Sequence, residues 1–290
     1  MSYIIATDSG CDISPALLKE WDVLLADLYF RFEGDDREYT NREMDTQEFY
    51  ARMRAGGISR TSAVNTEDFR SMFASALDAG KDVLYIGFDS AISSTCQSGM
   101  MAARELQEEY PERRIIAIDT LCASGGQGMV VWEAVRRQRE GVSLEDNADF
   151  VRQLSPGVSQ WFTVDDLVYL KRGGRVSAAA AFAGNLLNIR PVLHVDDEGR
   201  LINVSKARGR KASIAALVKE YMAAVERLGA KDGIPYFINQ GDCMKDALLM
   251  QDMIAEKTGR KAEYIMDIGP VIGSHTGPGI LALFFEGKQR

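Results

Sequence analysis

Small hydroxyl side chains follow several apolar segments of the chain, and they are the residues with the clearest potential for chemistry. In an open parallel sheet the carboxyl ends of the strands form one edge, where ligands bind. A helix N-terminus at such an edge offers free N–H donors and a partial positive charge, which suit a carboxylate or a phosphate. The hydroxyl residues are Thr7 and Ser9; Thr61 and Ser62; Ser93, Ser94 and Thr95; and Thr120 and Ser124.

Helix capping is the alternative explanation for these residues, because Ser and Thr are also preferred N-caps. For a single loop, capping explains the hydroxyls better than ligand binding does. Four such loops on one predicted edge leave the two explanations equally supported. The sequence by itself therefore predicts a site for a small anion without identifying that anion.

Motifs for catalysis or metal binding are scarce. Ser/His/Asp catalysis would need a nucleophile elbow such as GxSxG, which is absent, and the GGQG at 125–128 fits neither GxGxxG nor a P-loop. With only His194 and His275, and four cysteines that include no CxxC pair, neither a zinc site nor a cofactor is expected. A small-molecule hydrolase or transferase stays open as an alternative, with the hydroxyl loops and His275 as its general base.

Length and charge narrow the class of protein further. The chain of 290 residues exceeds a usual single core, so two domains are expected. Its 46% hydrophobic and 26% charged residues are typical of a soluble globular protein, without the roughly 20 apolar residues in a row of a membrane span. The net charge of −8 argues against nucleic acid and anionic membranes as partners. Because the N-terminus lacks the basic region of a signal peptide, a cytoplasmic location is expected.

Alternating strands and helices in residues 1–157 are expected to position the hydroxyl loops. The predicted strands are residues 4–7, 83–88 and 115–119. Each runs into a small-residue loop and then a helix, which predicts a Rossmann-like parallel sheet with helices on both faces. Residues 23–40 interrupt this pattern and predict an inserted hairpin with a turn at Gly34-Asp35, followed by a helix at 46–54.

Residues 158–290 are expected to form a second, α+β domain with a mixed or antiparallel sheet. A glycine-rich segment, KRGGRVS, opens this part and leads into small residues. The predicted elements are a helix at 178–187, strands at 190–196 and 199–208, a helix at 211–228, a strand at 235–239, a helix at 244–258, a strand at 263–268 and an apolar segment at 280–285.

Five motifs in order resemble the DegV family of fatty-acid-binding proteins, over nearly the whole chain. They are ATDSGCDIS at 6–14, TSAVNTEDF at 61–69, ISSTCQSGMMA at 92–102, DDLVYLKRGGRVSAAAAFAGNLLNIRPVL at 165–193 and HTGPG at 275–279. The chain departs from the family pattern at four positions. Ala63-Val64 stands where the family usually has glutamine-proline, Ser94 where it has glycine, and Cys96 where it often has an aromatic residue.

The resemblance implies a two-domain α/β fold, the DegV fold, that holds a long-chain fatty acid such as palmitate between the domains. The ligand carboxylate would be bound by Thr61, Ser62 and Ser93, with Ser94 and His275 close by. Some members of the family present the bound acid to a fatty acid kinase, which phosphorylates the carboxylate. The resemblance therefore implies a carrier that is not itself an enzyme, with the kinase as its protein partner.

The resemblance also suggests where the acyl chain and the partner would lie. The tail would run into the second domain, lined by Ala179, Phe182, Leu186 and Ile189. Close helix packing explains the same small residues equally well, because it too favours alanine and glycine. Arg172 and Arg175 would contact the kinase or form salt bridges with Asp165 and Asp166.

Overall fold

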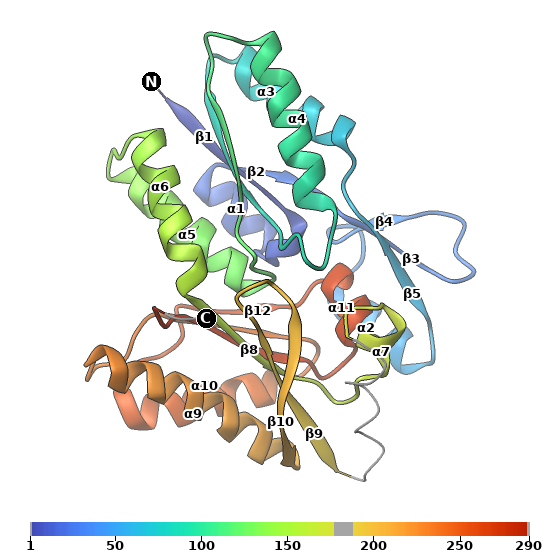
Figure 1. The fold of residues 1–290 in the computed structure, drawn as a ribbon. Coiled ribbons are helices and arrows are strands. Elements are labelled where there is room, and N and C mark those ends of the chain that lie inside the picture. Colours follow the sequence, from blue (N-terminus) through green and yellow to red (C-terminus); the bar gives the residue numbers. More distant parts are fainter. Residues whose placement is uncertain (1, 177–187, 289–290) are drawn as a thin grey trace.

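The computed structural model describes residues 2–176 and 188–288, which form three sheets flanked by helices (Figure 1). The first sheet has four parallel strands in the order β2-β1-β6-β7. The strands of this sheet are β1 (Tyr3–Asp8), β2 (Val23–Ala26), β6 (Asp82–Gly87) and β7 (Ile115–Asp119). The two central strands β1 and β6 are buried on both faces, as their apolar sequences predict.

Helices cover both faces of the parallel sheet, which confirms the α/β prediction. These helices are α1 (Pro15–Trp21), α3 (Thr66–Asp78), α4 (Thr95–Glu109), α5 (Gly125–Arg139) and α6 (Leu144–Leu154). Helices α3 and α4 pack on one face through a core that includes Phe69, Phe73 and Tyr85. Helices α1, α5 and α6 pack on the other face, around Leu84 and Ile86. Ser14 caps α1 through a bond from the Leu17 amide, and Pro15 opens the helix, a position that proline favours.

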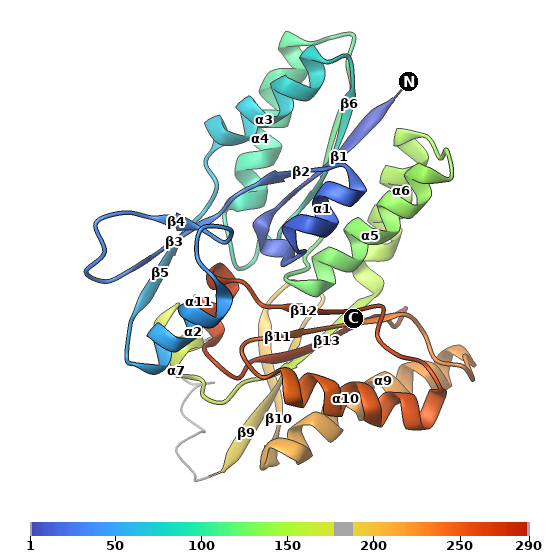
Figure 2. The same cartoon turned by 180° about the vertical axis from the view of Figure 1, so that it is seen from behind.

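The second sheet has six mostly antiparallel strands in the order β10-β9-β8-β13-β11-β12. Its strands are β8 (Val158–Thr163), β9 (Ile189–Val195), β10 (Leu201–Arg208), β11 (Tyr236–Gln240), β12 (Tyr264–Asp267) and β13 (Leu281–Glu286). Among the described strands of this sheet, only β11 and β12 pair in parallel, so the predicted mixed sheet is confirmed. Helices α9 (Arg210–Leu228) and α10 (Met244–Thr258) cover one face, and α5 packs against the other (Figure 2).

A third, small sheet corrects the predicted hairpin at 23–40. Residues Val23–Ala26 form β2 and pair with β1, because the left-handed Asp22 turns the chain back beside that strand. The hairpin itself consists of β3 (Tyr29–Phe32) and β4 (Tyr39–Thr40), and β5 (Ser59–Ser62) pairs with β3. Thr61 and Ser62 therefore lie within an antiparallel strand and not at the edge of the parallel sheet.

Several elements have no counterpart in the sequence prediction. They are α3, α6, β5, β8, α7 (Val168–Arg172) and α11 (Pro270–Thr276). Helix α11 packs against the helix α2 (Thr46–Arg54). The helix predicted at 178–187 lies outside the described residues. The division into domains 1–157 and 158–290 stays a prediction. Among the helices of the described residues, none is both long enough and apolar enough to cross a membrane.

Candidate functional site

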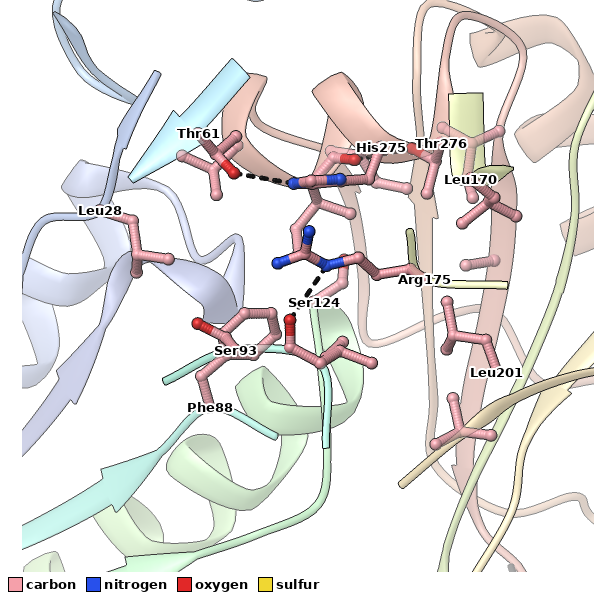
Figure 3. A pocket seen from close by; sticks show the side chains of 18 of the residues that line it. Leu28, Thr61, Phe88, Ser93, Ser124, Leu170, Arg175, Leu201, His275 and Thr276 are labelled. Atoms are coloured by element: carbon pink, nitrogen blue, oxygen red, sulfur yellow. Dashed lines mark hydrogen bonds between the residues drawn. The ribbon is translucent and has the colours of Figure 1, made fainter. Parts of the chain in front are cut away.

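A cavity of about 290 Å³ lies where the three sheets approach one another (Figure 3). Part of its apolar wall comes from the six-stranded sheet, and its polar end comes from β5, from loops and from the short helix α11. The lining residues are Leu28, Thr61, Ser62, Ala63, Phe88, Ile92, Ser93, Ser94, Ala123, Ser124, Gln160, Phe162, Leu170, Arg175, Val195, Leu201, Ile268, Val271, Ile272, His275, Thr276, Ile280, Ala282 and Phe284. The cavity therefore has the form of an apolar binding site with one hydrophilic end.

His275, in the last turn of α11, faces Thr61 of β5 across the polar end. Thr61 Oγ1 and His275 Nε2 are hydrogen-bonded at 2.8 Å, whereas His275 Nδ1 has no partner among the described residues. Burial and, as the smaller cause, the nearby positive charge of Arg175 together lower the pKa of His275 to about 4. The ring is therefore neutral at pH 7, and the donor and acceptor roles of its two nitrogens depend on the tautomer.

Arg175, just after α7, places a cation in the polar end. Its Nε donates to the Ile92 carbonyl at 3.1 Å and its Nη1 to the Gly173 carbonyl at 2.5 Å. The guanidinium lies between Ser93 and His275 (Figure 3). Among residues 2–176 and 188–288 no carboxylate forms an ion pair with it, and residues 177–187 contain neither Asp nor Glu. A half-buried positive charge without a counter-charge is a binding determinant for an anion.

Glycine at position 173 makes room for the histidine ring. A Cβ at this position would lie 2.1 Å from His275 Nδ1, closer than any real contact. The glycine-rich segment KRGGRVS therefore brings Arg175 and His275 together at the polar end. The sequence shows that this segment is rich in glycine, but no sequence pattern predicts that Gly173 contacts His275 of α11.

The loop between β6 and α4 brings two serines to the cavity. Ser93 Oγ donates to Thr95 Oγ1 at 3.0 Å and accepts from the Thr95 amide at 3.2 Å. Ser94 is the N-cap residue of α4, but among the described residues its side chain makes no capping bond to the helix. Ser62, in β5, also lines the cavity, and its Oγ donates to Glu38 at 2.5 Å. Ser93 and Ser94 thus present hydroxyl groups at the start of a 15-residue helix.

The structure brings together all five residues predicted to bind a carboxylate: Thr61, Ser62, Ser93, Ser94 and His275 line the one cavity. Other hydroxyl residues have structural roles instead. Thr7 and Thr120 donate to the carbonyls of Ile86 and Gly87, each at 2.8 Å, and Ser9 accepts from the Leu28 amide. Ser124 lines the cavity, although its hydroxyl donates to Asp12 at 2.6 Å.

The residues predicted for the acyl tail and the partner have mixed outcomes. Ala179, Phe182 and Leu186 lie outside the described residues, so their role stays a prediction. Ile189 begins β9 opposite Arg208 and is not among the described lining residues.

Arg172 is exposed, with its guanidinium 5.6 Å from the centre of the Tyr169 ring. The alternative interpretation, salt bridges from Arg172 and Arg175 to Asp165 and Asp166, does not occur among the described ion pairs. Asp165 pairs with Arg190 at 3.0 Å, and Asp166 accepts from the Val168 amide.

Metal binding has no support in the described part of the chain, where no group of three or more His, Cys, Asp or Glu side chains is placed to hold an ion. The apolar wall was not identified from the sequence. Its residues alternate along β8 and β13, as in Ala282 and Phe284, but this alternation does not reveal which strands lie side by side.

Comparison with known proteins places the chain in a family. The model of the DegV family matches residues 2–288. A DegV domain-containing protein of Clostridium perfringens is 38% identical, over 99% of this chain and 98% of that protein.

Solved structures agree with this match. A fatty-acid-binding DegV family protein from Thermus thermophilus has a TM-score of 0.87 at 30% identity, covering 99% of this chain and 100% of that one. A Thermotoga maritima protein with fatty acid binding function has a TM-score of 0.82 at 26% identity, covering 99% of each chain. These two structural neighbours of the chain bind fatty acids, and the chain itself belongs to the DegV family.

Proposed function

We propose that this protein binds a long-chain fatty acid in the cavity and acts as a carrier, with the carboxylate at the polar end and the acyl chain along the apolar wall. The observation that carries the proposal is Arg175, a cation without a carboxylate partner among the described residues, at the polar end of a cavity whose other walls are mostly apolar. The Thermus thermophilus relative, 30% identical over 99% of this chain, binds fatty acid and supports the same ligand.

The polar end suits a carboxylate for reasons of charge and of hydrogen bonding. Arg175 supplies the counter-charge, and the hydroxyls of Thr61 and Ser93 supply neutral donors. A neutral His275 can donate one N–H, depending on its tautomer. Hydrogen bonds to a charged group contribute roughly 1.5–3 kcal/mol each, so two or three of them fix the orientation of the ligand. Ser62 and Ser94 complete the rim of this head-group site.

The acyl chain supplies most of the affinity in this proposal. Palmitate has about fourteen methylenes, and burial contributes about 0.8 kcal/mol for each, or roughly 11 kcal/mol in total. Loss of translational and rotational freedom takes back several kcal/mol. The apolar wall made by Phe162, Val195, Leu201 and Ala282 gives the tail this environment.

Presentation of the bound carboxylate to a fatty acid kinase is the finer part of the proposal. The head-group site is formed by short segments at the rim, and the exposed Arg172 lies three residues from Arg175. In this arrangement a partner would reach the carboxylate without displacing the tail. The kinase would carry out the phosphorylation, and residues 1–157 and 158–290 would act as two domains that hold the acid between them.

A hydrolase or transferase is less well supported by the geometry. The Thr61–His275 pair has the 2.8 Å separation of a nucleophile and its base. However, a ring with a pKa of about 4 is a weak base at pH 7. No carboxylate of the described residues orients its Nδ1, in contrast to a catalytic triad.

The ligand can be identified directly. We expect denaturing extraction of the purified protein, followed by mass spectrometry, to release near-stoichiometric C14–C18 fatty acid. The delipidated protein should then bind added palmitate, and palmitic acid methyl ester, which lacks the negative charge, should bind at least tenfold more weakly. A preparation that contains no lipid and does not take up palmitate would refute the proposal.

Carrier and enzyme are separated by a second assay. The loaded protein should hydrolyse neither p-nitrophenyl esters nor p-nitrophenyl phosphate by itself, but should yield acyl phosphate when a bacterial fatty acid kinase and ATP are added. Ester or phosphate turnover that disappears in His275→Ala would favour the enzyme instead.

A further inference from the structure

Helix α11 carries His275, and two side chains from the first 41 residues of the chain hold its start. The residue before the helix is Gly269, which has no side chain to cap it. Asp12 Oδ1 accepts from the Gly269 amide at 2.9 Å, and Asn41 Oδ1 accepts from the Val271 amide at 3.0 Å. Pro270, between them, has no N–H. Both amides at the start of α11 are therefore bonded to residues far away in sequence.

Both side chains are themselves fixed. The second carboxylate oxygen of Asp12 accepts from Ser124 Oγ at 2.6 Å, and Ser124 lines the cavity. Asn41 Nδ2 donates to the Ser9 carbonyl at 3.1 Å. Asp12 is 8% exposed, so its bonds lie in a largely water-free environment. The start of α11 is thus tied to the loops at the ends of β1 and β4.

The two side chains lie so close to Gly269 that no side chain would fit at this position. A Cβ at Gly269 would lie 2.7 Å from Asn41 Nδ2 and 3.0 Å from Asp12 Oδ1. The helix has only seven residues, and His275 follows Gly269 by six positions, or about 9 Å along the axis. A tilt at the first turn therefore moves the imidazole ring relative to Thr61 and Arg175.

We propose that Asp12 and Asn41 are positioning residues that hold the His275 ring at the head-group site by fixing the first turn of α11. Neither residue lines the cavity, so they act through the helix and not by touching the ligand. The inference rests on the proposed function for its effect on fatty acid binding. Its structural part, the state of the His275 ring, is measurable without any ligand.

The test uses the delipidated full-length protein and its two histidines. Proton–carbon NMR follows the ring signals of His275 and His194 between pH 4 and 8, in the wild type and in Asp12→Ala. We expect His275 to stay neutral at pH 5.5 in the wild type and to become protonated in the variant, because a displaced ring gains water. His194, stacked on Trp161 at 4.2 Å, should be unchanged and serves as the internal reference.

Variants of graded severity separate positioning from stability. Asp12→Asn keeps an acceptor for Gly269, and we expect a wild-type His275 titration and palmitate affinity within threefold of the wild type. Asp12→Ala should lower the affinity at least fivefold. Asp82→Ala is the matched control, since this buried carboxylate accepts from the Arg114 amide at 2.9 Å away from the cavity. If Asp12→Ala does not fold, Asn41→Ala makes the same test at a partly exposed side chain.

The binding and NMR measurements distinguish a failure of the proposed fatty acid binding from a failure of the positioning role of Asp12 and Asn41. If the wild type binds no palmitate, the proposed function fails, and the NMR titration still decides whether Asp12 and Asn41 position the ring. If Asp12→Ala, or Asn41→Ala in its place, lowers only the melting temperature while His275 titrates as in the wild type, the positioning role is overturned. The same conclusion follows if Asp82→Ala shifts the His275 titration equally.

Discussion

In the apolar wall of the cavity, one group of side chains comes from neighbouring strands of a single sheet, whereas at the polar end each side chain comes from a different segment. Leu201, Val195, Phe162 and Ala282 lie on β10, β9, β8 and β13, which are adjacent in the six-stranded sheet. Thr61, Ser93, Arg175 and His275 come from β5, the β6–α4 loop, the segment after α7, and α11.

The two regions also differ in what they contribute to folding. The wall belongs to a buried apolar cluster, which stabilises the fold. The polar end has a cation without a carboxylate partner among the described residues and an imidazole nitrogen likewise without a hydrogen bond. Such groups oppose folding, because a buried charge or polar atom left without a partner costs free energy. The predictions below test this contrast.

The largest expected effect is the stability contribution of His275 as a function of pH, in the protein without ligand. The pKa of the ring is about 4 in the folded protein and 6.5 in the unfolded chain. Between these values the unfolded chain binds more protons, so stability falls as the pH falls from 6.5 to 4. This loss, roughly 2 to 3 kcal/mol, should be absent in His275→Gln.

Urea unfolding of both proteins at pH 7 and at pH 4 measures the difference. The buried carboxyls contribute in the opposite direction, since burial raises the pKa of Asp8 to about 6 and that of Asp12 to about 7. They are the same in both proteins and cancel in the comparison. An identical pH dependence of the wild type and His275→Gln would show that the ring is not kept neutral by the fold.

A change in the wall should have the next largest effect, on affinity. Ala282→Leu adds three carbons to a side chain that lines the cavity, so about three methylenes of the ligand lose their place. At about 0.8 kcal/mol each, palmitate should bind about 50-fold more weakly. Laurate, which is four carbons shorter, should lose much less.

Isothermal titration with both acids measures this effect. Leu283→Met, on the opposite face of the same strand, keeps the side-chain volume and should change neither affinity more than twofold. Equal losses for palmitate and laurate would contradict the assignment of the wall to the tail.

The apolar wall and the polar end also differ in how far the sequence predicts them, and for the wall it predicts single strands. Apolar runs such as those of β1 and β6 predict buried strands because both faces are covered, and the short spacing between the strands predicted at 190–196 and 199–208 is consistent with the observed β9–β10 pair. Strand β13 is apolar too, but its place between β8 and β11 depends on pairing with segments up to 128 residues away. Sequence patterns therefore identify strands but not the wall that they form together.

The polar end shows the limit differently. Residue types indicated Thr61, Ser93 and His275 through the family resemblance, yet Thr61 was expected at the edge of the parallel sheet and lies in β5. Arg175 was interpreted as a partner contact or an ion-pair residue. Its position in the cavity depends on Gly173 fitting against His275, a contact between segments 102 residues apart that no local pattern encodes.

Removal of the cation at the polar end should weaken binding by less than the change in the wall. Arg175→Gln removes the positive charge, and with it a charge-assisted hydrogen bond of about 2 kcal/mol, so palmitate should bind about 30-fold more weakly. Binding of the uncharged methyl ester should be unchanged. Arg172→Gln, at an exposed position, is the control and should leave both affinities as they are. A loss for the methyl ester equal to that for palmitate would mean that Arg175 supports the fold and not the carboxylate.

The smallest effect on affinity is expected for Ser93→Ala, and here the two regions should separate most clearly. Ser93 contributes one neutral donor, so palmitate affinity should fall less than fivefold, because the wall still holds the tail. Acyl phosphate formation with a fatty acid kinase should fall more than tenfold, because the head group loses part of its orientation.

Ser98→Ala, on helix α4 that follows Ser93 and outside the cavity, removes a hydroxyl that donates to the Ser94 carbonyl and should leave both quantities unchanged. A parallel fall of affinity and turnover in Ser93→Ala would mean that the polar end holds the ligand as the wall does. Unchanged turnover would remove Ser93 from the head-group site. Only the separate response, weak on affinity and strong on turnover, fits a polar end that orients a ligand held by its tail.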